Sequence, residues 1–264
     1  LYTGFITSDN GKQLVLKDTT GRLEVLPSAE VETKTKQKLS VMPDNAAMGL
    51  SEQELADLLE FLRSNPRVPG RRLSEQALFN GQDFTGWTFH SDTRGAKLEE
   101  VFTIENSVLV CKGNPIGYLR TTEDYTNFEL SLEWRHDPRF SPGNSGVLMR
   151  MHGADKVWPK SIEAQLQHRN AGDIWNIDEF PMQTEASRTE GRWTGKAQPC
   201  NEKPLGEWNR YDITLDGGEL RLYVNGELQN AAHWCEELPG KICLQSEGAV
   251  IQFRNIRIRK IERD

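Results

Sequence analysis

Three stretches between residues 128 and 168 decide the fold: FELSLEWR at 128–135, SGVLMRMH at 145–152 and SIEAQLQH at 161–168. In each, every second side chain is apolar, as in Ile162, Ala164 and Leu166 of the last stretch. Successive strand side chains point to opposite faces, so each stretch predicts a strand with one apolar and one polar face. Pairing of the three strands would merge their polar residues into one hydrogen-bonding patch. A solvated outer sheet face is the alternative.

Composition narrows the possible partners. The chain has 264 residues and a net charge of −7, without a run of Lys or Arg, which disfavours nucleic-acid and anionic-membrane partners. No apolar run approaches the length of a membrane span. The four cysteines lack C-x-x-C spacing, so a thiolate zinc site is not expected, although up to two disulfides could form. The chain begins at Leu1 without Met or a signal peptide, so we expect a processed or trimmed fragment of a longer protein. Separately, we expect a secreted or periplasmic protein, for which the cysteines are not proof.

Residues 1–65 predict a small appendage. Strands are expected at 2–7, 13–18 and 22–27, with an Asn-Gly hairpin turn at 10–11. Ser51 and Glu54 have capping-box spacing, so a helix should begin there and end before Pro66. Residues 66–74 then have the composition of a linker.

Residues 75–264 predict a mainly β domain. Strands are expected at 210–215, 219–224, 240–245 and 250–259, separated by Gly-rich turns, and helical periodicity is almost absent. So many strands in about 190 residues indicate a sandwich or a jelly roll of two antiparallel sheets. The long polar stretch 169–207 is expected to form loops over one end or face of this sandwich.

Several phrases of this domain resemble the 3-keto-disaccharide hydrolase family, over residues 75–262. They are LFNGQDFTGW at 78–87, YLRTTEDYTNFELSLEWR at 118–135, GNSG at 143–146, IEAQ at 162–165, GEWN at 206–209, LYVNG at 222–226, LQSEG at 244–248 and FRNI at 253–256. The resemblance implies a concanavalin-A-like jelly roll with a ligand site on the concave sheet face. It also implies an often secreted bacterial protein fused to other modules.

Residues 1–64 more weakly resemble the end of a cytochrome-c-like haem domain of planctomycete-type proteins, through LVLKD at 14–18, LSVMP at 39–43 and GLSEQELADL at 49–58. That likeness would make Met42 an axial haem ligand. The chain contains no C-x-x-C-H motif, so covalent haem is not expected and Met42 is read as an apolar contact.

The resemblance to the hydrolase family implies a substrate oxidised at C3 of the sugar. A C3 ketone acidifies the C2 proton, so a base can remove it and expel the anomeric oxygen, after which water adds to the enone. This path needs a general base, an acid, and a donor to the enolate oxygen. It does not need the two opposed carboxylates of ordinary glycosidases.

The strand faces suggest which residues supply these groups. Glu163 is the first choice for the base, or else a structural partner of Arg150. Glu247 is the candidate acid or hydroxyl-binding group, or else a solvated carboxylate at a strand end. Arg150 is the candidate donor to the keto or enolate oxygen, or else pairs with Glu133 or Glu163.

We assign six further side chains to substrate binding: Gln165, Gln245, Glu133, His168, Trp175 and Trp193. His168 could act as acid or base near pH 7, or be a surface residue. Trp175 and Trp193 could stack on sugar rings, or pin loops. A metal on Glu163, His168 and Asp173 lacks any recognised ligand spacing, so no metal or cofactor is assigned, and a structural calcium ion stays open.

We therefore expect a carbohydrate-active hydrolase or lyase for 3-keto glycosides. The ligand is an oligosaccharide or 3-keto sugar, and further partners are upstream domains of a longer parent chain. The alternatives are a non-catalytic carbohydrate-binding module and a structural adhesion domain, because the fold supports all three.

Overall fold

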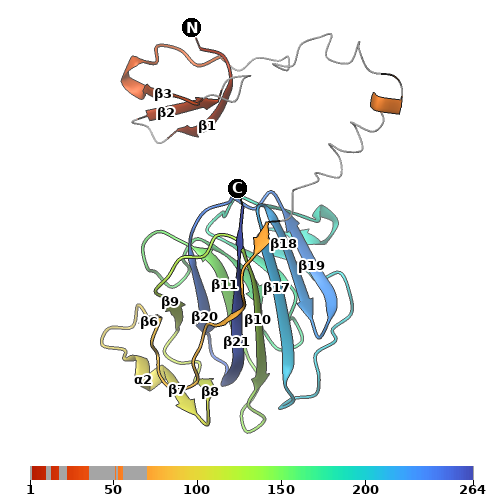
Figure 1. The fold of residues 1–264 in the computed structure, drawn as a ribbon. Helices are drawn as coiled ribbons and strands as arrows, with labels where there is room; N and C mark the ends of the chain where they lie inside the picture. Colours follow the sequence, from red (N-terminus) through yellow and green to blue (C-terminus); the bar gives the residue numbers. More distant parts are fainter. Residues whose placement is uncertain are drawn as a thin grey trace. The chain divides into compact units, whose positions relative to one another are not determined.

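The computed structural model describes residues 2–9, 13–17, 23–35, 51, 53–55 and 70–263. The chain divides into two compact units, Leu1–Val68 and Pro69–Asp264. Figure 1 shows the strands of each. No helix within the described residues is both long and apolar enough to cross a membrane.

The first unit contains an antiparallel sheet of three strands, β1 (Phe5–Asp9), β2 (Gln13–Lys17) and β3 (Leu23–Pro27), followed by the short 3-10 helix η1 (Ser28–Glu30). The predicted capping box is confirmed, since the Glu54 backbone N–H donates to Ser51 Oγ and the Ser51 N–H donates to Glu54 Oε2. The predicted turn at 10–11, Met42, the rest of the helix to residue 65 and most of the linker lie outside the described residues.

The second unit is a sandwich of two antiparallel sheets, as predicted (Figure 1). The ten-stranded sheet follows the order β14 (Gln183–Thr184), β19 (Glu227–His233), β18 (Glu219–Val224), β17 (Asn209–Asp216), β10 (Phe128–His136), β21 (Ile251–Glu262), β8 (Val108–Cys111) and β7 (Phe102–Glu105), and β4 (Arg71–Arg72) and β5 (Gln76–Ala77) also pair with β21. The only α-helix within residues 70–263 is the single turn α2 (Leu98–Val101).

The eight-stranded sheet carries the candidate site. Its order is β15 (Thr189–Glu190), β16 (Trp193–Thr194), β13 (Ile174–Ile177), β12 (Ser161–Gln165), β11 (Gly146–Met151), β20 (Lys241–Ser246), β9 (Gly117–Thr121) and β6 (Trp87–His90). Residues 169–207 were predicted as loops, and this is wrong in part. They supply three strands of this sheet, β14 of the other sheet and the 3-10 helix η2 (Ala186–Arg188), and strands of two to four residues are too short to show a period of two.

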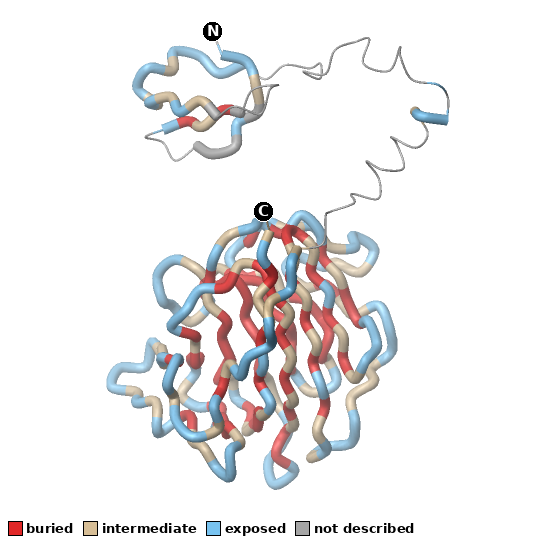
Figure 2. The backbone as a smooth tube through the Cα atoms, viewed as in Figure 1, coloured by how far each residue is buried: buried red, intermediate tan, exposed pale blue. Residues whose placement is uncertain are grey.

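The core lies between the sheets, and Figure 2 shows that the buried residues lie mainly along the strands. In β10 buried and half-buried residues alternate strictly, because one face meets the core and the other meets solvent. In β11 and β12 every residue is buried, so both faces of these strands are covered. The side of β11 and β12 away from the core is therefore not a solvated surface.

Candidate functional site

Strand register places a row of side chains on the outer face of the eight-stranded sheet. Glu163 of β12 lies opposite Leu148 of β11 and Trp175 of β13, and Trp175 lies opposite Trp193 of β16. Directly opposed residues of antiparallel strands point to the same side. Their chain neighbours Ile162, Ala164 and Ile174 belong to the core, so this row faces away from it. We call this outer surface the site face.

Gly146 makes room for the central polar pair of the site face. A Cβ on Gly146 would stand 2.5 Å from Glu163 Oε1 and still closer to Gln245 Oε1. Both side chains therefore lie over the Gly146 Cα, one reaching in from β12 and the other from β20. Any larger residue at position 146 would displace them.

Several buried polar atoms converge here without a well-formed hydrogen bond among the described residues, although Gln245 lies close enough to Glu163, and Asn144 to Glu247, to lower the pKa of each carboxyl group in part. These atoms are Glu163 Oε1, both side-chain polar atoms of Gln245, Glu247 Oε2 and Asn144 Oδ1. Asn144 forms a β-bridge with Glu247 at the end of β20, so these four residues are neighbours on adjoining strands. A buried polar atom without a partner costs about 1–3 kcal/mol, and a bound hydroxyl-rich ligand would supply the missing partners.

The two carboxyl groups of this cluster are weaker acids than usual. Burial, followed by the negative charge of Glu247, raises the pKa of Glu163 to about 8. Burial raises the pKa of the less enclosed Glu247 to about 7. At neutral pH Glu163 is thus mainly protonated while Glu247 is partly ionised, which suits one group as acid and the other as base.

A loop covers one end of the site face. Residues 152–160, which we call the strap, are fixed by Asp155, whose carboxylate accepts hydrogen bonds from Tyr118 Oη at 2.8 Å and from Arg120 at 3.0 Å. Further along the strap, the Val157 N–H donates to Asp92. Beneath it, Tyr118, Leu148, Met151 and Cys243 form a small buried apolar cluster.

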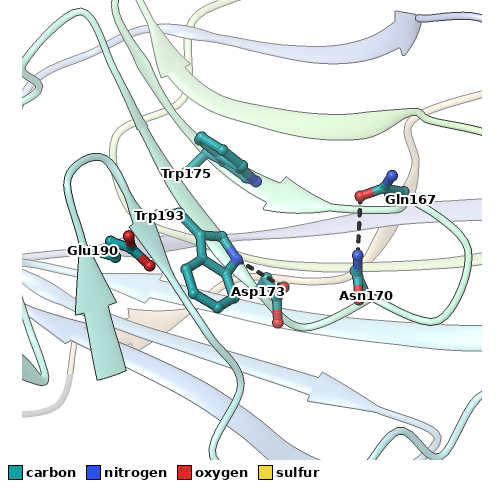
Figure 3. Close-up of a pocket in the computed structure, with 6 residues that line it drawn as sticks. All are labelled: Gln167, Asn170, Asp173, Trp175, Glu190 and Trp193. Atoms are coloured by element: carbon teal, nitrogen blue, oxygen red, sulfur yellow. Dashed lines mark hydrogen bonds between the residues drawn. The ribbon is translucent and has the colours of Figure 1, made fainter. Parts of the chain in front are cut away.

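The other end of the site face opens into a pocket of about 410 Å³, shown in Figure 3. Its lining consists of two indole rings and polar side chains: Trp175, Trp193, Gln167, Asn170, Asp173 and Glu190. We call it the stacking pocket. Trp193 is held in place because its Nε1–H donates to Asp173 at 2.8 Å, and Asn170 donates to Gln167 Oε1 at 2.9 Å. Aromatic faces with amide groups at their edges are suited to sugar rings.

The predicted position of Arg150 is wrong. Arg150 is fully buried, and its guanidinium donates to the carbonyl oxygens of Thr126, Cys235, Glu236 and Gly217 and to Asn127 Oδ1. A guanidinium has five N–H donors, and these five acceptors leave none for a substrate. The Arg150 backbone has a φ of 48° and lies in an irregular part of the β11–β20 pairing. The prediction assumed that side chains alternate regularly between the two faces of β11, and this irregularity interrupts that alternation. Arg150 therefore has a structural role, although it pairs with neither Glu133 nor Glu163.

The predicted position of Glu133 is also wrong. Its strand, β10, belongs to the ten-stranded sheet. There Glu133 accepts hydrogen bonds from Arg254 at 2.5 Å and Asn255 at 3.1 Å on the outer face. The three strands of the opening pattern thus do not share one sheet: only β11 and β12 pair, and the polar face of β10 is a solvated, ion-paired surface.

Two further candidates have mainly structural contacts. Gln165 lies two residues from Glu163 on the site face, but its Oε1 accepts the backbone N–H groups of Leu166 and Gln167. His168 lies beyond β12, with its Nδ1 3.5 Å from the Glu202 carboxylate and its ring edge-on to His136. The structure does not gather His168 with Glu163 and Asp173: no three Asp, Glu, His or Cys side chains among the described residues are grouped to hold a metal ion.

Other residues of the site were not recognised in the sequence. Asn144 and Gly146 stand in the GNSG phrase that carried the family resemblance, so that phrase was the available signal. Gln167, Asn170 and Glu190 line the stacking pocket. The alternation of residues 161–168 places Gln167 on the polar face with Glu163, but Asn170 and Glu190 lie in the stretch predicted to be loops, where no periodicity assigns a face.

Comparisons with known proteins agree with this architecture. A 3-keto-disaccharide hydrolase of Bacteroides thetaiotaomicron is 22% identical over 232 residues, covering 70% of this chain and 78% of that protein. Two solved structures from Parabacteroides distasonis, provisionally assigned as glycosyl hydrolases, have TM-scores of 0.52 and 0.54 at 22% and 21% identity. They cover 81% and 72% of this chain, and 98% and 100% of their own.

A more distant structure is SCLam, a non-specific endo-β-1,3(4)-glucanase of glycoside hydrolase family 16, with a TM-score of 0.50 at 12% identity, covering 74% of this chain and 96% of its own. This likeness supports the predicted jelly-roll fold. The family model described as a 3-keto-alpha-glucoside-1,2-lyase-like domain matches residues 74–259, most of the chain. The predicted resemblance over 75–262 is thus confirmed, and the protein belongs to the 3-keto-alpha-glucoside-1,2-lyase-like family of carbohydrate-active, hydrolase-like proteins.

Proposed function

We propose that this protein cleaves 3-keto glycosides on the site face by elimination followed by hydration. One observation carries the proposal: two carboxyl groups of raised pKa, the buried Glu163 and the half-buried Glu247, lie on the site face, and Glu163 stands opposite Trp175 of the stacking pocket. The name of the Bacteroides relative adds the substrate class.

The acidity of the two groups suggests their roles. Glu247, the more readily ionised, takes the C2 proton of the keto ring as the bond from C1 to the leaving oxygen breaks. Protonated Glu163 gives its proton to that oxygen. The sequence predicted Glu163 as the base. Because Glu163 is more deeply buried and holds its proton more tightly than Glu247, we assign it the role of acid and Glu247 the role of base.

Hydration of the enone restores both groups. Water adds to C1 and returns a proton to Glu163. The carboxyl proton of Glu247 exchanges with solvent before it is delivered to C2, so the net reaction consumes one water and C2 receives a solvent proton. A donor is also needed for the enolate oxygen that forms at C3. We assign this to the buried Gln245 amide, whose end lies with that of Glu163 over Gly146, in place of Arg150.

The test is the turnover of a 3-keto disaccharide by the wild type and by the Glu163→Gln and Glu247→Gln variants. Removal of a general acid or base should lower kcat by about 10²–10⁴-fold. Glu133→Gln is the matched control, since it changes a glutamate on the opposite sheet, and it should keep wild-type kcat. Unaltered turnover in both site variants would refute the assignment. Binding of the disaccharide without turnover by the wild type would instead indicate a carbohydrate-binding module.

A further inference from the structure

The strap closes one end of the site face and the stacking pocket opens at the other, which limits how a saccharide can lie on this face. We infer that the protein acts from the end of a saccharide: the oxidised terminal ring lies against the closed end, and the ring attached to the leaving oxygen lies on Trp175 and Trp193. This inference rests on the proposed function and specifies which substrates the site takes.

The closed end leaves no room for a sugar beyond the oxidised ring. Counting away from the stacking pocket, the residues after Glu163 on the site face are Leu148 and Cys243, which are opposed in register and 0% exposed. On the next strand the row reaches the half-buried Arg120, which pairs with Asp155 of the strap, and Tyr118, two residues away on the same strand, is 0% exposed and also donates to Asp155. A saccharide could extend in this direction only by displacing the strap.

Hydrogen bonds and ion pairs hold the strap in two directions along the sheet, toward β6 and β9 and toward β13. On the β6 side, the Val157 N–H donates to Asp92, and Arg120 forms an ion pair with Asp155 at 3.0 Å. On the β13 side, Lys156 pairs with Asp178 at 2.8 Å. These contacts reach both β9 and the residue after β13, so they hold the strap across the strands between them.

The open end has the spacing and chemistry for a second ring. Adjacent strands lie about 4.8 Å apart, so Trp175 and Trp193 stand one and two strands from Glu163 along the row. The Asp173 carboxylate accepts from both the Trp193 indole and the Lys196 N–H, which fixes the indole ring. In Figure 3 the polar groups of Gln167 and Asn170 lie at one side of the two indoles and Glu190 at the other.

This arrangement fits a pyranose. The C–H face of a sugar ring stacks on an indole, while its equatorial hydroxyls reach amide and carboxylate groups at the edge. The predicted substrates are therefore disaccharides and longer chains whose non-reducing terminal ring carries the C3 ketone. The predicted product is a single 3-keto monosaccharide.

The experiment compares two substrates in two variants. Trp193→Ala should lower kcat/KM about ten-fold for a 3-keto disaccharide, whose second ring loses its platform. It should leave kcat/KM for the 3-keto methyl glycoside, which has no second ring, within about two-fold of wild type. Trp208→Ala is the control, because Trp208 lies against Arg135 and Arg254 of the other sheet and should affect neither substrate selectively.

The other possible results test the second-ring platform, end-on cleavage and the proposed function separately. An equal loss for both substrates, or no loss for either, would overturn the assignment of the second ring to Trp193. Equal turnover of trisaccharides oxidised at the terminal and at the middle ring would overturn end-on cleavage. If the wild type turns over neither small substrate, the proposed function fails. Calorimetric binding of the disaccharide then tests the platform alone: weaker binding by Trp193→Ala supports it, and unchanged binding overturns it.

Discussion

Replacing Glu163 with glutamine should make the protein more stable at alkaline pH. Burial and the neighbouring Glu247 raise the pKa of Glu163 from 4.5 to about 8. Between these two values the folded protein keeps a proton that the unfolded chain has lost. Raising the pH through this window therefore destabilises the wild type, and the neutral amide of Glu163→Gln escapes that cost.

The size of the effect follows from the pKa. One pKa unit corresponds to 1.36 kcal/mol, so the full change to about 8 corresponds to an upper limit of roughly 5 kcal/mol above pH 8. Relaxation and water entry around an ionised buried carboxylate reduce this, and we expect about 2–4 kcal/mol. Below pH 4.5 both side chains are neutral, and the two proteins should agree to within about 1 kcal/mol.

The assay is urea unfolding of the full chain at intervals from pH 4.5 to 9, for the wild type, Glu163→Gln and Glu133→Gln. Across the window, the free energy of unfolding of the wild type should fall relative to that of Glu163→Gln by up to about 1.4 kcal/mol per pH unit. Glu133→Gln loses a partly exposed ion pair with Arg254 and should gain no stability as the pH rises. A constant difference between the wild type and Glu163→Gln from pH 5 to 8.5 would refute the reasoning.

Three further predictions test other parts of the site. Gly146→Ala should lower kcat at least about ten-fold while costing only about 1 kcal/mol of stability, because the new Cβ displaces two side-chain ends rather than backbone; a kcat equal to that of the wild type would show that their positions do not matter. Arg150→Met should lower the free energy of unfolding by about 3 kcal/mol or more, because buried carbonyl groups lose their hydrogen-bond donors. A variant that is fully stable but inactive would show instead that Arg150 acts in the reaction. The wild-type kcat should peak between about pH 7 and 8, where Glu247 is ionised and Glu163 protonated; a rate unchanged from pH 5 to 9 would exclude this division of roles.

The alternation of apolar and polar residues predicted which face of a strand meets the core, but it did not predict which sheet the strand belongs to. It placed Glu163 and Gln245 correctly away from the core, because β12 and β20 alternate regularly. It could not assign β10 to the opposite sheet, since two strands of a sandwich can have the same pattern whether they pair or face one another across the core. Glu133 was misplaced for that reason.

Irregular backbone geometry and very short strands limited how much more of the site could be predicted from the sequence. The positive φ of Arg150 accompanies an irregular pairing that no sequence period shows. The stacking pocket depends on strands of two to four residues, whose side chains have too few neighbours to define a face. Trp175 and Trp193 were noticed as aromatic residues in a polar stretch, but their adjacency required the register of β13 and β16.

The most direct test of the account follows hydrogen at C2 during cleavage of a 3-keto disaccharide in deuterated water, measured by NMR at the earliest time points. Elimination through Glu247 and rehydration predict a released 3-keto sugar that carries deuterium at C2, formed faster than the same product, incubated alone, exchanges that hydrogen. Release of a product that still carries protium at C2 would mean that the glycosidic bond breaks without removal of that proton, and would contradict the account.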